Sequence, residues 1–294
     1  MAELRVFASL PALNFALAEA VASTMNSAVR AHGRCSIALA GGNTPRRLYS
    51  VLGTDFKKHI PWKHVHVFWG DERLVPPGDP MRNDRMAREM LLDKVPCPKR
   101  QIHPMAWRAK PAPDEAAREY EETMRQYFAD GRPRFDLVIL GLGPEGHTAS
   151  LFPGSPALDE REQWVCAVTV PATPSSRLTL TVPVFNQAAN VYFLATGAAK
   201  APALRDALGH DTDPRTCPAA AVRPVDGKVT WWADAPGAAG ARDSDPDMHK
   251  GAVEQTDHDP IVPIEPYGAN FGDTEVSNAD ELGRTSDTPR DEQS

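Results

Sequence analysis

The sequence predicts an α/β fold with a mainly parallel β-sheet flanked by helices, and three observations lead to this prediction. Apolar runs alternate with helical patterns along the first 240 residues, in the repeated order of strand and helix that builds parallel sheets. The run Asp136–Leu140 is continuously apolar after its first residue, as expected for a parallel strand covered on both faces. A chain of 294 residues with 41% hydrophobic content is also long enough to bury a sizeable core.

The predicted elements follow from these runs in chain order. The clearest strands are Cys35–Ala40, Val65–Trp69, Asp136–Leu140 and Val191–Thr196, with weaker candidates at Trp164–Val170, Leu178–Thr181 and Lys228–Trp232. The clearest helices are Leu13–Ala31, Pro45–Leu52, Asn83–Asp93, Asp114–Ala129 and Ala198–Leu208. Folds of this class bind ligands outside the carboxyl ends of their strands. Function is therefore expected in the loops that follow Ala40, Trp69, Leu140 and Thr196.

The chain is predicted to divide into a domain over residues 1–240 and an acidic tail over residues 241–294. The tail carries 14 acidic and 4 basic residues, a net charge of −10, whereas the remainder has a net charge of +3. Only seven of the 54 tail residues, or 13%, are Leu, Ile, Val or Phe. This fraction is below the roughly 20% that a strongly charged segment needs in order to fold. We expect a disordered solvating tail, and the alternative is a segment that binds an unknown partner.

Composition also excludes several classes of protein. The four cysteines lie far apart without a Cys-x-x-Cys pair, which excludes the usual zinc spacing and favours a reducing compartment. No run of about 18 apolar residues occurs, so no membrane partner is expected. No nucleic-acid partner is expected, although the acidic charge that would argue against one is concentrated in the tail. The apolar segment Leu10–Ala22 predicts an amphipathic helix rather than a signal peptide. A cytoplasmic protein is expected.

The first of the four loops, Ala40–Pro45, is typical of an anion site. Gly41 and Gly42 let the backbone approach a ligand closely. Asn43 or Thr44 can cap the helix that follows. Exposed N–H groups at a helix N-terminus attract anions, phosphate above all. The alternative interpretation of this loop is a plain strand-to-helix turn. The loop lacks the Gly-Lys-Ser/Thr of a nucleotide-binding P-loop.

The second loop places three charged residues directly behind the apolar strand Val65–Trp69. In this position Asp71 can accept a proton or orient a base, and Arg73 can bind a phosphate or a carboxylate. The alternative is a solvated surface salt bridge. Asn83, further along, is a substrate-binding candidate and also a credible helix N-cap. His64 and His66 would share one face of this strand, but no third ligand accompanies them, so no metal site is expected.

The third loop, Gly141–Gly146, follows a strand and matches the pattern Gly-x-Gly-x-x-Gly of dinucleotide sites. Pro144 removes a donor from that turn, and Pro153 ends any following helix within about two turns, so a dinucleotide site is not favoured. His147 is expected at the start of a helix behind this loop, where a general base would stand. Ser150 is a conceivable nucleophile, but the Gly-x-Ser-x-Gly elbow is absent.

The fourth loop is followed by Lys200 in the first turn of a predicted helix. A cation there opposes the helix dipole, so an anionic ligand is the natural explanation, with a surface lysine as the alternative. Arg177, just before the weaker strand Leu178–Thr181, is a further candidate cation.

Together these motifs resemble the 6-phosphogluconolactonase branch of the glucosamine-6-phosphate isomerase/6-phosphogluconolactonase family. The resemblance runs from about Ala8 to Trp232 and implies a sheet related to the folds of glucosamine-6-phosphate deaminase and ribose-5-phosphate isomerase. It implies hydrolysis of 6-phospho-glucono-1,5-lactone to 6-phosphogluconate in the oxidative pentose phosphate pathway, with no cofactor and no metal. The motifs that carry it are Ala40–Pro45, Trp69–Arg73, Gly141–Gly154, Arg177–Thr181 and Gly197–Ala201.

Some positions depart from the pattern of the family. Asn43 and Arg82 each stand where the family usually has serine, and Glu145 stands where it usually has aspartate. In the deaminase branch a glutamate lies five residues after the histidine, whereas this chain has Phe152, which cannot titrate. The resemblance therefore favours the lactonase over amino-sugar deamination.

The resemblance and the loop chemistry imply one mechanism. His147 takes a proton from a water molecule that attacks the lactone, Asp71 orients a side chain or the water, and the phosphate docks on the Gly41–Thr44 backbone. The alternatives are a non-catalytic sugar-phosphate sensor, a sugar-phosphate deaminase or isomerase on the same fold, and a dinucleotide-dependent oxidoreductase. The expected site consists of His147 and Asp71 for catalysis, with Gly41, Gly42, Asn43, Thr44, Arg73, Asn83, Arg177 and Lys200 for substrate binding.

Overall fold

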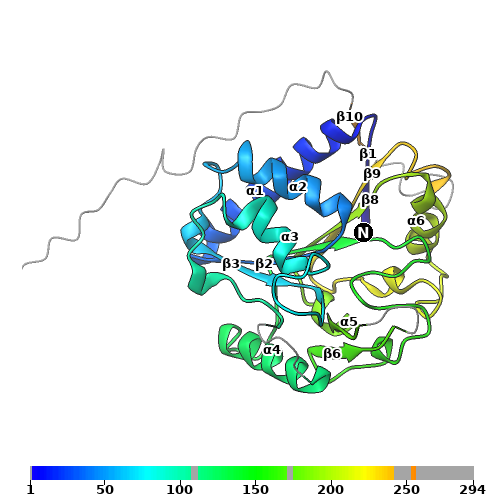
Figure 1. The fold of residues 1–294 in the computed structure, drawn as a ribbon. Helices are drawn as coiled ribbons and strands as arrows, with labels where there is room; N and C mark the ends of the chain where they lie inside the picture. Colours follow the sequence, from blue (N-terminus) through cyan, green and yellow to red (C-terminus); the bar gives the residue numbers. More distant parts are fainter. Residues whose placement is uncertain (1, 107–111, 171–174, 242–252, 256–294) are drawn as a thin grey trace, which may run out of the picture.

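A seven-stranded sheet lies at the centre of the structure, a computed structural model that describes residues 2–106, 112–170, 175–241 and 253–255 (Figure 1). The strand order is β10-β1-β9-β8-β5-β2-β3, and every neighbouring pair is parallel. This arrangement confirms the predicted α/β fold. The strands are β1 (Ala2–Phe7), β2 (Cys35–Leu39), β3 (Val65–Trp69), β5 (Leu137–Gly141), β8 (Asn190–Ala195), β9 (Lys228–Asp234) and β10 (Val253–Gln255).

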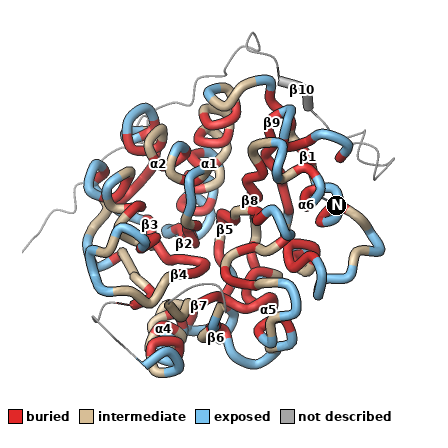
Figure 2. Tube along the Cα trace, turned by 45° about the vertical axis from the view of Figure 1, so that its right-hand side comes forward, coloured by how far each residue is buried: buried red, intermediate tan, exposed pale blue. Residues whose placement is uncertain are grey.

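The middle of this sheet is buried on both faces, and Figure 2 shows it as a largely buried layer. Leu137, Val138 and Ile139 of β5 have no solvent-exposed surface, which explains why that run is apolar without alternation. Phe193 of β8 stacks on Trp231 of β9 with ring centroids 3.9 Å apart. Such a core holds the strand ends, and the loops that leave them, in fixed positions.

A second, smaller sheet has three antiparallel strands in the order β4-β7-β6: β4 (Asp71–Arg73), β7 (Arg177–Leu180) and β6 (Val165–Val168). The segment after Trp69 is therefore a strand, and the prediction of a loop there is wrong. The N–H of Gly70 donates to the carbonyl of Leu39 at 2.9 Å, while its carbonyl accepts from the N–H of Leu180 at 2.8 Å. The chain thus passes from the large sheet to the small one at Gly70.

Helices cover both sheets. Helix α1 packs against α2 and contacts β1, β2 and β9, whereas α4 packs against β6 and β7 of the small sheet (Figure 1). The predicted helix Asn83–Asp93 is α-helical only to Ala87 and continues as a π-helical turn, Arg88–Leu92. The helices are α1 (Leu10–His32), α2 (Asn43–Thr54), α3 (Asn83–Ala87), α4 (Pro113–Tyr127), α5 (Val182–Phe185) and α6 (Ala201–Leu208).

Strands from the first and the last described residues lie together at one edge of the large sheet. Strand β1, which is absent from the strands predicted above, pairs with β9 and with β10. Strand β10 belongs to the predicted tail, and the remainder of that tail, residues 242–252 and 256–294, lies outside the described residues. The division of the chain at residue 240 stays a prediction. Within the described part, no helix is long and apolar enough to cross a membrane.

Candidate active site

A cavity of about 200 Å³ opens where the carboxyl ends of β2, β5 and β8 meet the small sheet. A larger cavity of about 480 Å³, beside Leu158 and Arg215, contains none of the predicted site residues, so we place the site in the smaller cavity. Asn83 does not line it and lies buried behind it. The other nine predicted residues line it together: Gly41, Gly42, Asn43, Thr44, Asp71, Arg73, His147, Arg177 and Lys200.

One wall of the cavity is the N-terminus of α2. The helix begins at Asn43, two residues earlier than predicted, and Gly42 is its N-cap with a φ of 100°. The expected capping by the Asn43 or Thr44 side chain is therefore wrong, and no side chain caps this helix. The Thr44 hydroxyl instead lies 2.9 Å from that of Thr196, at the end of β8. The first N–H groups of α2 and its dipole remain directed at the cavity, an arrangement that favours an anion.

Asp71 is held by two donors from distant parts of the chain. The Ser150 hydroxyl donates to Asp71 Oδ2 at 2.7 Å, and Asn83 Nδ2 donates to Asp71 Oδ1 at 3.1 Å and to its carbonyl at 2.8 Å. Ser150 is completely buried, so its hydroxyl serves Asp71 and is not exposed as a nucleophile. The N-cap of α3 is Arg82, so the expected capping role of Asn83 is also wrong. Its side chain turns towards β4 instead, and a Cβ on Gly41 would overlap it.

Arg73 and Arg177 form a pair of cations on the small sheet. They face each other in the register of β4 and β7, and both line the cavity. The Nε atom of each is buried without a hydrogen-bond partner. Burial, and the charge of Arg73, lower the pKa of Arg177. Because like charges directly opposite in a sheet are destabilising, an anionic ligand between them is the natural explanation.

His147 lies across the cavity with a carboxylate partner that the sequence did not identify. Its Nδ1 is 2.8 Å from Glu145 Oε1, and a quarter of its side chain is exposed. Partial burial tends to raise the pKa of the Glu145 carboxyl. Its own backbone N–H, His147 and Lys200 outweigh this effect, so the pKa is lowered overall. The sequence signal that could have identified Glu145 as this partner is its position two residues before His147 in a glycine-rich loop. The Phe152 ring packs on His147 with centroids 4.6 Å apart.

No helix begins at His147, so that expectation is wrong. Residues 144–150 form turns, with Gly146 at a φ of 84° and Ala149 at 48°, conformations outside the right-handed helical region. The carbonyl of His147 accepts from the Gly143 N–H at 2.8 Å, which folds the loop back on itself. A Cβ on Gly143 would overlap the imidazole, so glycine is what allows the ring to lie over the loop.

Lys200 lies at the end of a 3-10 turn, Ala198–Lys200, and is the N-cap of α6 rather than part of its first turn. Burial lowers the pKa of its ammonium group, and nearby Glu145 opposes that shift. A partly buried cation beside the N-terminus of α2 adds to the attraction for an anion.

The two histidines near β3 are not placed as the sequence suggested. His64 ends a 3-10 turn, whereas His66 lies in β3 with its Nδ1 3.1 Å from His103 Nε2. Among the described residues, no three His, Cys, Asp or Glu side chains are placed to hold a metal ion.

Comparison with known proteins agrees with this geometry. Residues 9–231 match the family described as glucosamine-6-phosphate isomerases/6-phosphogluconolactonase. The chain belongs to this family. A 6-phosphogluconolactonase of Synechocystis sp. is 41% identical over 217 residues, which cover 73% of this chain and 88% of the relative. That of Mycobacterium leprae is 38% identical over 219 residues, covering 71% and 86%.

Solved structures of the glucosamine-6-phosphate isomerase/6-phosphogluconolactonase family have the same fold. The 6-phosphogluconolactonase of Trypanosoma cruzi superposes with a TM-score of 0.71 at 30% identity, over 82% of this chain and 97% of that one. A monomeric glucosamine-6-phosphate deaminase superposes with a TM-score of 0.66 at 19% identity, which shows a common fold alone. The family comparison therefore confirms the resemblance inferred from the motifs.

Proposed function

We propose that this chain hydrolyses 6-phospho-glucono-1,5-lactone to 6-phosphogluconate in the oxidative pentose phosphate pathway. The names of its relatives support this activity. The observation that carries the proposal is the pairing of His147 with Glu145 in a cavity that also holds three cations, Arg73, Arg177 and Lys200. A base and an anion site in one cavity are what hydrolysis of a phosphorylated lactone requires.

The carboxylate partner decides which nitrogen of His147 acts as the base. An ionised Glu145 can only accept a hydrogen bond, so the proton of a neutral imidazole resides on Nδ1. Nε2 is then the free base and takes a proton from water. Glu145 also stabilises the imidazolium that forms, because its negative charge lies beside the ring.

The substrate phosphate docks at the N-terminus of α2. Backbone N–H groups of Gly42, Asn43 and Thr44 approach it, and Lys200 and Arg73 supply charge from either side. Asn43 places an amide at a position where the family pattern has serine, and an amide can also donate to phosphate. Arg177 supplies a further positive charge on the side of the small sheet.

Hydrolysis then proceeds in two steps. Water loses a proton to His147 Nε2 and attacks the lactone carbonyl carbon, giving a tetrahedral oxyanion that a cavity cation or a backbone N–H stabilises. The oxyanion collapses, the bond from C1 to the ring oxygen breaks, and the imidazolium returns the proton to that oxygen. Asp71 already holds two donors, so we assign it an orienting role rather than that of the base.

The test is to measure turnover of the phosphorylated lactone, generated in situ, against its spontaneous hydrolysis. Purified protein should accelerate ring opening of the phosphorylated lactone much more than that of the non-phosphorylated lactone. Lys200→Ala should chiefly raise KM, because it removes a phosphate partner. No acceleration over the spontaneous rate would refute the proposed activity, and an unchanged KM would remove Lys200 from the phosphate site.

A sugar-phosphate sensor is the second candidate, and thermal stabilisation by 6-phosphogluconate without any turnover would support it. Deamination is less favoured, because the ring of Phe152 packs on His147 at the position where the deaminase branch has a glutamate. A cytoplasmic location stays a prediction.

A further inference from the structure

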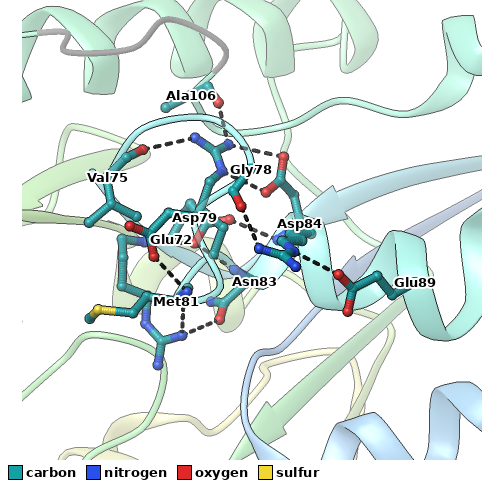
Figure 3. A network of polar contacts seen from close by, with 12 residues as sticks. Glu72, Val75, Gly78, Asp79, Met81, Asn83, Asp84, Glu89 and Ala106 are labelled. Atoms are coloured by element: carbon teal, nitrogen blue, oxygen red, sulfur yellow. Dashed lines mark hydrogen bonds and ion pairs between the residues drawn. The ribbon is translucent and has the colours of Figure 1, made fainter.

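Glu72 is a charged residue with no solvent-exposed surface, and it does not line the cavity. Its Oε1 accepts from the backbone N–H of Arg73 at 2.7 Å and of Asn83 at 2.8 Å, and its Oε2 accepts from the N–H of Asp84 at 2.9 Å. One carboxylate therefore joins strand β4 to the start of α3, ten residues further along the chain (Figure 3).

Two of these three bonds, those from the N–H groups of Asn83 and Asp84, do for α3 what its own N-cap does not. The side chain of Arg82, the N-cap residue, makes no capping bond, and the first N–H groups of the helix are satisfied by Glu72 instead. Burying a carboxylate is costly unless donors surround it. The carboxylate of Glu72 thus fixes the backbone of β4 and the start of α3 relative to each other.

A buried arginine fixes the same loop from its other side. Arg82, only 2% exposed, donates to both carboxylate oxygens of Asp84 at 2.6 and 3.0 Å and to the carbonyls of Val75 and Ala106. This arginine departs from the family pattern of serine, so the loop is held here by an ion pair and two carbonyl contacts (Figure 3).

The outcome of these constraints is the position of Asn83. Its Oδ1 accepts from Arg73 Nη1 at 2.7 Å, and the same nitrogen donates to the carbonyl of Met81 at 2.8 Å. Its Nδ2 donates to Asp71. Two acceptors on the loop thus orient the Arg73 guanidinium, while one donor orients Asp71.

We propose that Glu72 is a positioning residue of the anion site: by binding the backbone of Asn83 and Asp84 it sets the direction in which Arg73 presents its guanidinium to the substrate. The inference rests on the proposed function, because it takes the substrate phosphate as the ligand of Arg73. Glu72 touches no substrate and acts through Asn83.

The decisive variant is Glu72→Gln, assayed at pH 8. Glutamine keeps the length of the side chain and one oxygen for the N–H groups of Arg73 and Asn83, but its amide meets the N–H of Asp84, so two donors face each other. We expect KM for the phosphorylated lactone to rise about tenfold, the effect of losing one charge-assisted hydrogen bond, with a much smaller change in kcat. Glu89→Gln, an exposed glutamate on the turn after α3, is the matched control and should keep the wild-type KM.

A double-mutant cycle separates positioning from general damage to the fold. Arg73→Met alone should raise KM, and adding Glu72→Gln to it should produce no further rise, because the group that Glu72 positions is already gone. Adding Glu72→Gln to Lys200→Ala should multiply the two effects. Glu72→Asp, which keeps the charge but is shorter, is the second variant and should give the same pattern if the glutamine variant does not fold.

Each outcome has one meaning. Wild-type protein that fails to hydrolyse the lactone refutes the proposed function and not the role of Glu72. With an active wild type, an unchanged KM in folded Glu72→Gln and Glu72→Asp overturns this inference. A KM effect that persists in full in the Arg73→Met background, or a loss confined to kcat, also overturns it.

Discussion

Arg73 and Arg177 are direct register partners on the antiparallel strands β4 and β7. Two guanidinium groups side by side repel each other, and each keeps a buried Nε without a hydrogen-bond partner. An anion in the cavity between them would offset this repulsion, because phosphate or a developing oxyanion can accept hydrogen bonds from both guanidinium groups. The pair is thus understood as part of a site rather than as part of the framework.

The Arg177→Met variant tests that interpretation. We expect KM for the phosphorylated lactone to rise about tenfold, since a hydrogen bond to a charged group is lost. The free energy of unfolding should stay within about 1 kcal/mol of wild type or rise, because the like charge opposite is relieved. Urea denaturation and steady-state kinetics measure the two quantities. A large loss of stability with unchanged KM would make the arginine structural, and Arg132→Met, an exposed arginine, is the control.

Glu145→Gln tests the carboxylate partner of His147. The variant keeps the size of the side chain but loses the charge that fixes the Nδ1 proton and stabilises the imidazolium. We expect kcat to fall about ten- to hundredfold, which corresponds to one hydrogen bond to a charged group. Glu162→Gln, at an exposed glutamate of the same chain, should turn over like wild type. Equal kcat for both variants would mean that Glu145 does not act through His147.

Gly143→Ala tests whether the loop backbone must make room for the imidazole. The new Cβ would overlap the His147 ring, so the ring must move, and kcat should fall at least tenfold while the protein stays folded. Gly141→Ala, in the same loop, would place its Cβ where no protein atom lies within 4 Å, and its kcat should fall much less. Similar losses in the two variants would contradict the packing argument.

Glu72 gives a prediction for the pH dependence of stability. Burial raises the pKa of its carboxyl from 4.5 to about 7, against the opposing effect of its N–H donors. The folded state therefore holds the proton more tightly than the unfolded state, and this stabilisation is present below about pH 4.5 and is lost as the pH rises to about 7.

Glu72→Gln removes this titration, which makes the variant the reference. Between pH 5 and pH 8, the free energy of unfolding of wild type should fall relative to that of Glu72→Gln, by at most about 1.4 kcal/mol per pH unit. Urea denaturation of both proteins at several pH values measures the difference. A difference that does not change with pH would show that Glu72 has an ordinary pKa.

The sequence was sufficient to bring most of the predicted site residues together at one cavity, because parallel strands share one carboxyl edge. The loops after β2, β5 and β8 meet there and supply six of the nine predicted residues that line the cavity, whereas Asp71, Arg73 and Arg177 come from the small sheet. What failed were local expectations: capping by Asn43 or Asn83, and a helix starting at His147. Capping propensity depends only on the residue and its place next to a helix. At Asn83 the hydrogen bonds of the side chain to Asp71 and Arg73 replace a capping role.

The hydrogen-bond partners of the site residues could not be predicted from the sequence, because they lie far from them along the chain. Ser150 donates to Asp71 across 79 positions of sequence, and Glu72 reaches Asn83 across 11. These contacts follow from the small antiparallel sheet, and β4, with three residues, is too short to produce a periodic pattern. A hydrogen bond between distant segments leaves no signal in a single sequence.

In the proposed mechanism His147 is the base that activates water, so His147→Ala is the most informative variant to assay. With the phosphorylated lactone generated in situ, we expect a kcat about 10²- to 10⁴-fold below wild type, the usual contribution of general base catalysis. The thermal unfolding midpoint should stay near that of wild type, because the side chain is partly exposed. A folded His147→Ala protein with wild-type kcat would rule out His147 as the base.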